Sequence, residues 1–130
     1  MTNDELGRFA ADYAKAWSSG DPEAVVAFYA KNASISVNDG GPAPISEVAQ
    51  AFIRDFPDMI VTFDKLEPRP DGAAFHWTLI GTNTGPSGTG RRVRISGYEL
   101  WKIGDDGLIA ESQGHFDGTE YARQLGRSAD

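Results

Sequence analysis

Helical and strand patterns occupy separate parts of this chain, and this separation constrains the fold more than any other feature. Apolar residues at helical spacing are confined to residues 3–57, whereas residues 59–116 carry runs of β-branched and aromatic residues bounded by turn residues. Parallel strands need long crossover connections, so strands joined by short turns predict a mainly antiparallel sheet. Helices followed by such a sheet are typical of the α+β class.

Three helices are predicted in the first part of the chain. Thr2 and Glu5 form a capping-box pattern at the start of an amphipathic segment over residues 3–18. Asp21 stands directly before a proline, which is the start signal of a second helix. Ser46 is expected to cap the third helix, which ends before the next proline.

Five strands are predicted, four of them in the second part of the chain. They are expected at residues 35–37, 59–67, 73–83, 92–103 and 108–116. A strongly curved sheet wrapped around three helices leaves a concave space, which is a natural ligand pocket. The 130 residues are expected to form a single domain (1–130), with the helical part, the sheet part and a short tail over residues 117–130.

Composition excludes several classes of function. Lys and Arg number 12 against 19 Asp and Glu, and the net charge of -7 disfavours binding to nucleic acid. The chain has no cysteine, no apolar run long enough to span a membrane and no secretory signal at its start, so a cytoplasmic protein without a membrane partner is expected. Its two histidines, His76 and His115, show no metal-ligand spacing, and no metal site is expected. The glycine-rich residues 81–90 lack phosphate-loop spacing and predict a hairpin loop at the mouth of the pocket.

Acid–base chemistry in an apolar cavity is the chemistry that remains. Polar residues recur at spacing two near the end of the last predicted strand, at Glu111, Gln113, His115 and Asp117. In an unbroken strand they share one face. That face is either a solvated outer face, or some of its residues line the concave side, where burial would raise the pKa of a carboxyl group and suit it to proton transfer.

Two further residues have alternative interpretations. Tyr13 lies on the apolar stripe of the first helix, where it is either core filler or a hydroxyl donor to a ligand oxygen. Glu99 lies between apolar residues of a predicted strand. If Glu99 points inward it is an acid held protonated, and if it points outward it is a surface residue.

Several local strings resemble a known family when they are taken together. Their order along the chain is Tyr13-x3-Trp17-x2-Gly20-Asp21, Phe56-Pro57-Asp58, Trp77 to Gly85, Asp106 to Glu111, and Asp117 followed by Gln124-Leu125-Gly126. This order resembles the SnoaL-like polyketide (ester) cyclase branch of the nuclear transport factor 2-like superfamily. The resemblance covers nearly the whole chain.

The resemblance implies a cone-shaped α+β barrel that commonly forms a homodimer through its sheet. Cyclases of this branch close a ring by an intramolecular aldol reaction in a hydrophobic cavity, without a cofactor or a metal, using an aspartate that falls on Asp117. The branch often has histidine where this chain has Asn83 and Ser112. His115 is the expected substitute.

Ketosteroid isomerases of the same superfamily offer a second comparison. Their oxyanion-hole tyrosine falls on Tyr13 and their protonated acid falls near Glu99. Their general-base aspartate falls on Val37, which cannot take a proton, so a steroid isomerase of that mechanism is not expected.

The sequence therefore predicts a cofactor-free acid–base cyclase or isomerase that acts on a hydrophobic, oxygenated, polyketide-like small molecule by aldol-type ring closure. The expected catalytic residues are Asp117, His115 and Tyr13, and the expected substrate-binding residues are Glu99, Asn83, Trp17, Trp77 and Trp101. Two alternatives stay open. One is a small-molecule-binding or dimerisation module without catalysis, and the other is an epoxide-opening hydrolase or cyclase.

Overall fold

The computed structural model describes residues 1–127, which form four helices and one six-stranded sheet. The helices are α1 (Asn3–Ser18), α2 (Pro22–Val26), α3 (Ile45–Asp55) and α4 (Gly118–Gln124). The strands are β1 (Tyr29–Val37), β2 (Ala43–Pro44), β3 (Ile60–Arg69), β4 (Gly72–Thr82), β5 (Arg92–Ile103) and β6 (Ile109–Phe116). The α+β class is confirmed, and the tail that follows the sheet contains α4.

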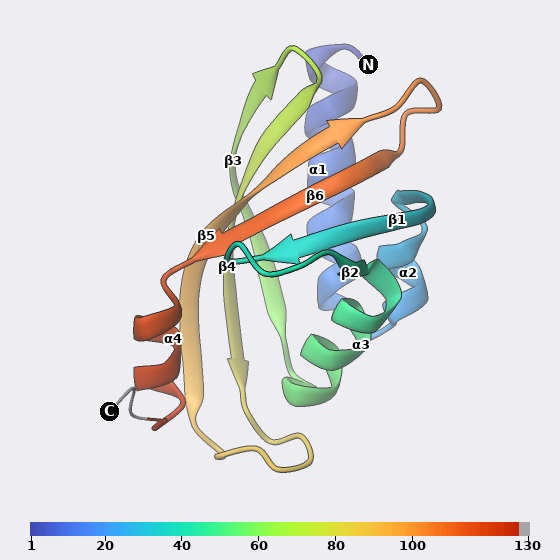
Figure 1. Cartoon of the computed structure of the whole chain (residues 1–130). Coiled ribbons are helices and arrows are strands. Elements are labelled where there is room, and N and C mark those ends of the chain that lie inside the picture. Colours follow the sequence, from blue (N-terminus) through green and yellow to red (C-terminus); the bar gives the residue numbers. More distant parts are fainter. Residues whose placement is uncertain (128–130) are drawn as a thin grey trace.

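The sheet has the strand order β2-β1-β6-β5-β4-β3. Strands β3 to β6 form an antiparallel meander, as the short turns between them predict, and β1 is the one strand of the described sheet that pairs in parallel, with β6. The sheet curves around α1 and α3, which lie against its concave side (Figure 1). This curvature gives the sheet a concave and a convex face, which carry different side chains.

Helix α1 begins and packs as its sequence predicts. The Thr2 hydroxyl accepts a hydrogen bond from the Glu5 amide, and the Glu5 carboxylate accepts one from the Thr2 amide, each at 3.1 Å. Its buried stripe includes Leu6, Tyr13 and Trp17, which turn toward the concave face of the sheet. The apolar stripe of α1 that the sequence predicts therefore packs into the interior, facing the sheet.

Helix α3 differs from its prediction at one end. It follows Pro44 directly, and no side chain caps it, so the prediction that Ser46 is the cap is wrong. The reason is tertiary: the two residues of β2 pair with β1, and the chain enters the helix at Ile45 straight from that pairing. No helix in residues 1–127 is both long and apolar enough to cross a membrane.

Candidate functional site

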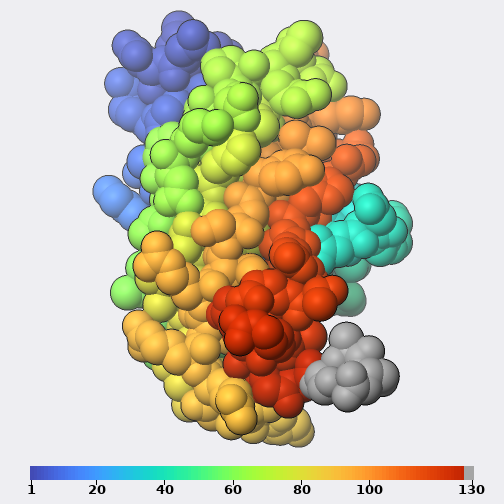
Figure 2. All heavy atoms as spheres, turned by 90° about the vertical axis from the view of Figure 1, so that its left-hand side faces the viewer, coloured from blue at the N-terminus to red at the C-terminus, as the bar shows by residue number. Residues whose placement is uncertain are grey.

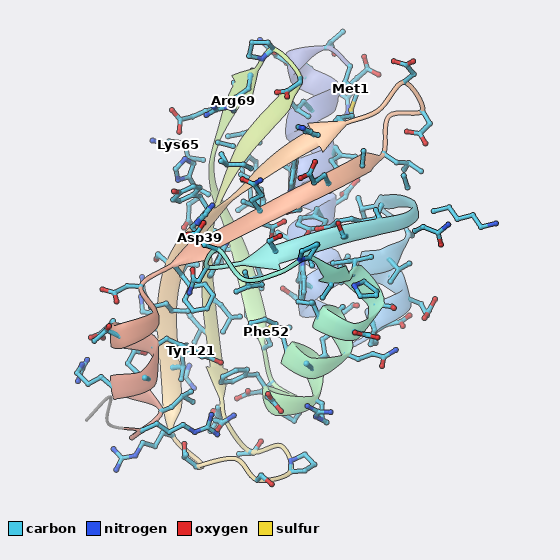
Figure 3. The ribbon with its side chains drawn as sticks, in the orientation of Figure 1. Met1, Asp39, Phe52, Lys65, Arg69 and Tyr121 are labelled. Atoms are coloured by element: carbon cyan, nitrogen blue, oxygen red, sulfur yellow. The ribbon has the colours of Figure 1, made fainter. Side chains whose placement is uncertain are left out.

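An apolar cavity lies between the concave face of the sheet, α1 and α3. Its volume is about 60 Å³, and its lining comes from both helices and from every strand except β2. The lining side chains are aliphatic or aromatic with one exception, the carboxyl group of Glu99. Phe52 of α3 is one of them and lies on the side of that helix nearest the sheet (Figure 3). A polar substrate group entering this cavity therefore meets one ionisable side chain among the residues described.

Glu99 is held by four donors that all reach the same oxygen. Its Oε1 accepts hydrogen bonds from Ser112 Oγ at 2.8 Å, Tyr13 Oη at 2.9 Å, Trp101 Nε1 at 3.0 Å and Tyr29 Oη at 3.3 Å. These donors come from β6, α1, β5 and β1. Only 6% of Glu99 is exposed. An ionised carboxyl group only accepts hydrogen bonds, and a protonated one still accepts through its carbonyl oxygen, so this arrangement fixes Oε1 as the accepting oxygen in either protonation state.

The two tyrosines act in series on Oε1. Their hydroxyl oxygens are 2.7 Å apart, and each hydroxyl has a single proton to donate. When Tyr13 donates to Glu99, Tyr29 is closer to Tyr13 than to the carboxyl and can donate to the Tyr13 oxygen. Tyr29 then supports Tyr13 as a donor.

The second carboxyl oxygen, Oε2, is in a different position. No hydrogen bond to it is found within residues 1–127, and Glu99 belongs to the cavity lining. Oε2 is therefore the oxygen left to meet a ligand. A proton on Glu99 also belongs on Oε2, because Oε1 already faces four donors.

Burial controls the ionisation of this group. Removal from water raises the pKa of Glu99 above its ordinary value, and the hydrogen bonds from Trp101, Ser112 and Tyr13 oppose that rise without cancelling it. Burial, together with the nearby charge of Glu99, also raises the pKa of Tyr13 well above its usual value. The tyrosine stays a proton donor in its hydrogen bond while the carboxyl group can gain or lose its proton.

The polar stripe at the end of β6 does not line the cavity. Gly114 and Phe116 face the concave side and line it, so the residues between them face the other way. His115 stacks on Tyr98 of the neighbouring strand, with ring centroids 5.0 Å apart. Of the two interpretations of this stripe, the structure shows the outer face, and the expectation that its residues line the concave side is wrong.

Asp117 lies one residue beyond β6 and outside the cavity. It is exposed, and its carboxylate caps α4 by accepting a hydrogen bond from the Glu120 amide at 3.0 Å. The structure thus does not bring Asp117 and His115 together with Tyr13, which is fully buried. The catalytic roles expected for Asp117 and His115 stay predictions.

The expected binding residues divide into three groups. Trp17 and Trp77 line the cavity, and Trp101 stands behind the carboxyl group as one of its donors. Asn83 is buried away from the cavity, where its amide receives a hydrogen bond from the Thr89 amide and donates one to the Asp55 carbonyl. Asn83 therefore holds the glycine-rich loop against the end of α3 and does not touch the cavity.

Two residues of the site were not expected from the sequence as carboxyl ligands, Tyr29 and Ser112. Ser112 lies at spacing two from Gly114 and four from Phe116, so the apolar side of β6 was the signal that it points inward. Tyr29 gave no comparable signal, because it begins β1 six residues before the strand predicted at residues 35–37. Residues 1–127 hold no group of three His, Cys, Asp or Glu side chains arranged to bind a metal.

Comparison with known proteins finds a matching family. A family model for SnoaL-like polyketide cyclases matches residues 8–125. A search of curated proteins finds no match. TsrD from Streptomyces laurentii is similar in structure, with 21% identity, a TM-score of 0.82 and 98% of each chain covered.

Two further solved structures share the fold. IdmH from Streptomyces antibioticus, named as a proposed polyketide cyclase, has 24% identity and a TM-score of 0.74 over 94% of this chain and 99% of its own. A protein with the ketosteroid isomerase-like fold from Catenulispora acidiphila, solved with trimethylamine, has 17% identity and a TM-score of 0.78 over 96% and 95% of the two chains. At these identities the likeness shows the fold alone.

Proposed function

The chain belongs to the SnoaL-like polyketide cyclase family, and we propose that it is a cofactor-free acid–base enzyme that closes a ring in a hydrophobic, oxygenated small molecule by an intramolecular aldol reaction. In this proposal Glu99 is the group that takes and returns the proton. Asp117, to which the resemblance gave that role, lies outside the cavity as the cap of α4.

The observation that carries the proposal is the asymmetry of the Glu99 carboxyl group. Four donors hold Oε1, whereas Oε2 has no partner within the described residues and belongs to a side chain of the cavity lining. A carboxyl group fixed on one side and free on the other can exchange a proton with a substrate without moving. Such preorganisation is what an enzyme needs for general acid–base catalysis.

The reaction balances with this single group. Ionised Glu99 takes a proton through Oε2 from the carbon next to a carbonyl, which leaves an enolate. The enolate carbon forms a bond to the carbon of a second carbonyl in the same molecule, whose oxygen becomes an alkoxide. Protonated Glu99 then returns the proton to that alkoxide, so the carboxylate is regenerated and no water or other reactant is consumed. An isomerase would share the first step and return the proton to a different carbon.

The raised pKa of Glu99 suits both halves of this cycle. A carboxylate with an ordinary pKa is a weak base, and burial makes it a stronger one. The best catalytic pKa lies near the working pH, because the group must be ionised for the first step and protonated for the last.

Exchange of a carbon-bound proton is a test that needs no knowledge of the natural substrate. We expect the protein to speed deuterium uptake from D₂O at the methyl group of acetophenone, followed by proton NMR. Glu99→Gln keeps an acceptor at Oε1 and removes the acid–base oxygen, and it should lower the rate by about 10²- to 10⁴-fold.

Asp117→Asn is the matched control. Asparagine caps helices as well as aspartate does, so α4 should remain in place. We expect this variant to exchange the proton at the wild-type rate. Loss of exchange in Asp117→Asn with retention in Glu99→Gln would transfer the role to Asp117 and contradict the proposal.

A binding module without turnover is the second candidate. It is favoured by the lining of the cavity, which offers apolar contact and, among the described residues, no second ionisable side chain to share the work of proton transfer with Glu99. A protein that binds the ketone, seen as shifts of its NMR signals, but does not exchange its protons would support this candidate.

We also propose the homodimer that the resemblance implies, formed through the convex face of the sheet. Strands β3 to β6 lie side by side on that face, with α4 over one end of it (Figure 2). Ile60 and Tyr98 are large apolar residues exposed there. Light scattering that gives the mass of a single chain would contradict the dimer.

A further inference from the structure

Two buried donors in this molecule have no acceptor. Within residues 1–127, the buried side-chain nitrogen and oxygen atoms without a hydrogen-bond partner are Trp17 Nε1 and Trp77 Nε1. More than about 90% of buried polar groups in proteins are satisfied, and an unsatisfied one opposes folding. The burial of these two indole N–H groups without acceptors therefore requires an explanation.

Both orphan donors belong to the wall of the same cavity. Trp17 comes from α1 and Trp77 from β4, and each lines the cavity that holds the Glu99 carboxyl group. The third indole of the chain, Trp101, is not part of the lining, and it donates to Glu99 at 3.0 Å. The fold thus satisfies the indole that is not part of the lining and leaves the indoles of the two lining tryptophans without acceptors.

The neighbours of these donors offer only weak alternatives. The Trp17 indole lies close enough to the Tyr13 hydroxyl to oppose the rise of its pKa, but it forms no hydrogen bond with good geometry there. Phe52 packs edge-on against Trp17 at 6.3 Å between centroids, and Phe116 packs against Trp77 at 6.0 Å. Contacts of N–H groups with ring faces are second-order interactions compared with a hydrogen bond to oxygen. Phe52 and Phe116 also line the cavity. Because both indole nitrogens are buried, a ligand reaches them only if it displaces the side chains that cover them.

Charge restricts what kind of oxygen the ligand presents. The described lining contains the Glu99 carboxyl group and no lysine or arginine. A carboxylate or phosphate ligand would meet an acidic group in apolar surroundings with no cation to offset it, which is costly. Neutral acceptors such as carbonyl oxygens fit indole N–H groups, which donate and cannot accept.

We infer that Trp17 and Trp77 form a two-donor subsite that binds two separate neutral oxygens of one ligand, and that the ligand class is a diketone or a related compound with two carbonyl groups. The inference rests on the proposed function in one respect, since ring closure by the aldol reaction needs a second carbonyl whose oxygen becomes charged. The N–H groups would hold the enolate oxygen and the alkoxide oxygen while Glu99 moves the proton. Binding by the indoles is nevertheless measurable without turnover.

The test uses the Glu99→Gln variant of the full chain, labelled with ¹⁵N. This substitution prevents conversion of the ligand during the measurement. The variant's three tryptophans give three indole N–H signals, assigned by Trp17→Phe and Trp77→Phe. The probes are heptane-2,6-dione, heptan-2-one and heptane, which share a seven-carbon chain and carry two, one and no carbonyl oxygens. We expect the dione to move the proton signals of Trp17 and Trp77 downfield, as new hydrogen bonds do.

Affinity gives the second readout. We expect the dione to bind about tenfold more tightly than the monoketone, which is the size of one buried hydrogen bond. Trp17→Phe and Trp77→Phe keep most of the apolar contact and remove one N–H each. Each variant should reduce the advantage of the dione over the monoketone to about twofold or less, while binding of heptane changes little.

The outcomes separate this inference from the proposed function. Downfield shifts of both indoles in Glu99→Gln, together with no exchange of ketone protons by the wild type, would keep the subsite and contradict the acid–base role. Two results would overturn the subsite: millimolar dione moves neither indole signal, or the dione and the monoketone bind with equal affinity. If the wild type still exchanges ketone protons in that case, the acid–base role stands.

Discussion

The concave and convex faces of the sheet are built from alternate residues of the same strands, yet they treat a carboxyl group in opposite ways. On the concave face, burial raises the pKa of Glu99 despite the donors gathered around one of its oxygens. On the convex face, Glu67 accepts a hydrogen bond from His76 at 2.6 Å in open solvent, and this contact lowers the pKa of its carboxyl group. Removal of water on one side and its retention on the other decide which carboxyl group has a raised pKa and which a lowered one.

The same contrast holds for neutral polar groups. On the convex side the Thr78 hydroxyl bonds both Asp64 and Ser96, so short polar side chains satisfy one another across strands. On the concave side the polar atoms converge on one oxygen or, for two indoles, find no acceptor. The convex face pairs its polar groups with one another, whereas the cavity wall on the concave face leaves polar groups available for a ligand.

The largest test of this contrast compares two tyrosines. Tyr13 is 0% exposed and packs against five other aromatic rings, whereas Tyr98 on the convex face is 38% exposed. Tyr13→Ala should lower the free energy of unfolding in urea by about 3–5 kcal/mol, the usual cost of removing a buried aromatic ring. Tyr98→Ala should cost about 1 kcal/mol or less. Equal losses for the two variants would show that the interior is not packed as described.

Two glycines on the concave face give the next effect. A Cβ atom on Gly97 would lie 2.3 Å from the His115 carbonyl oxygen, whereas one on Gly114 would meet no atom closer than 3.6 Å. Gly97→Ala should therefore destabilise the fold by about 1–3 kcal/mol through overpacking. Gly114→Ala should leave stability nearly unchanged and weaken ligand binding, because the new methyl group projects into the cavity wall. Unfolding in urea and titration with heptane-2,6-dione measure the two effects.

The third prediction concerns pH. The pKa of Glu99 is higher in the folded than in the unfolded chain, so the folded state binds more protons and its stability falls as pH rises from about 4.5 through the raised pKa. Each unit of pKa difference corresponds to about 1.4 kcal/mol. Glu99→Gln cannot ionise and should lack this fall in unfolding curves recorded from pH 4 to pH 9. A wild-type curve that rises where the variant stays flat would mean that the pKa of Glu99 is lowered instead.

The smallest expected effect is on the convex face. Glu67→Gln removes the charge of an exposed ion pair with His76, and such pairs contribute little to stability. We expect no measurable change in the urea midpoint or in ketone exchange. A change in the exchange rate would mean that the two faces of the sheet are coupled, which nothing in their packing requires.

Local signals predicted the fold better than they predicted the site. The capping box of α1 is contained within Thr2 and Glu5, and the turns of the meander lie in short stretches of chain, so both can be read from neighbouring residues. Ser46 failed as a cap because the pairing of β2 with β1, a tertiary contact, decides where α3 begins.

The site depends on contacts that the sequence does not bring together. Tyr13 and Tyr29 reach Glu99 from 86 and 70 residues away, and no local pattern marks them as partners. The family resemblance identified Tyr13 and Glu99 as site residues, and the apolar side of β6 could have revealed Ser112. The sequence could not tell which face of the sheet carries His115. Side chains alternate between the two faces along a strand, and one extra residue in the strand reverses this alternation.

The pairing of β6 with β1 also bears on how the chain is made. β6 lies between β5 and β1 and joins the helical half of the chain to the meander (Figure 1). During synthesis, β1 must wait for nearly the whole chain to emerge before its parallel partner exists, and contacts of such long separation form slowly. Ser112 arrives with β6, so the Glu99 carboxyl group gains its full set of donors only when the last strand docks. A ribosome-bound chain that stops before residue 109 should therefore hold the meander's early hairpins and no formed site.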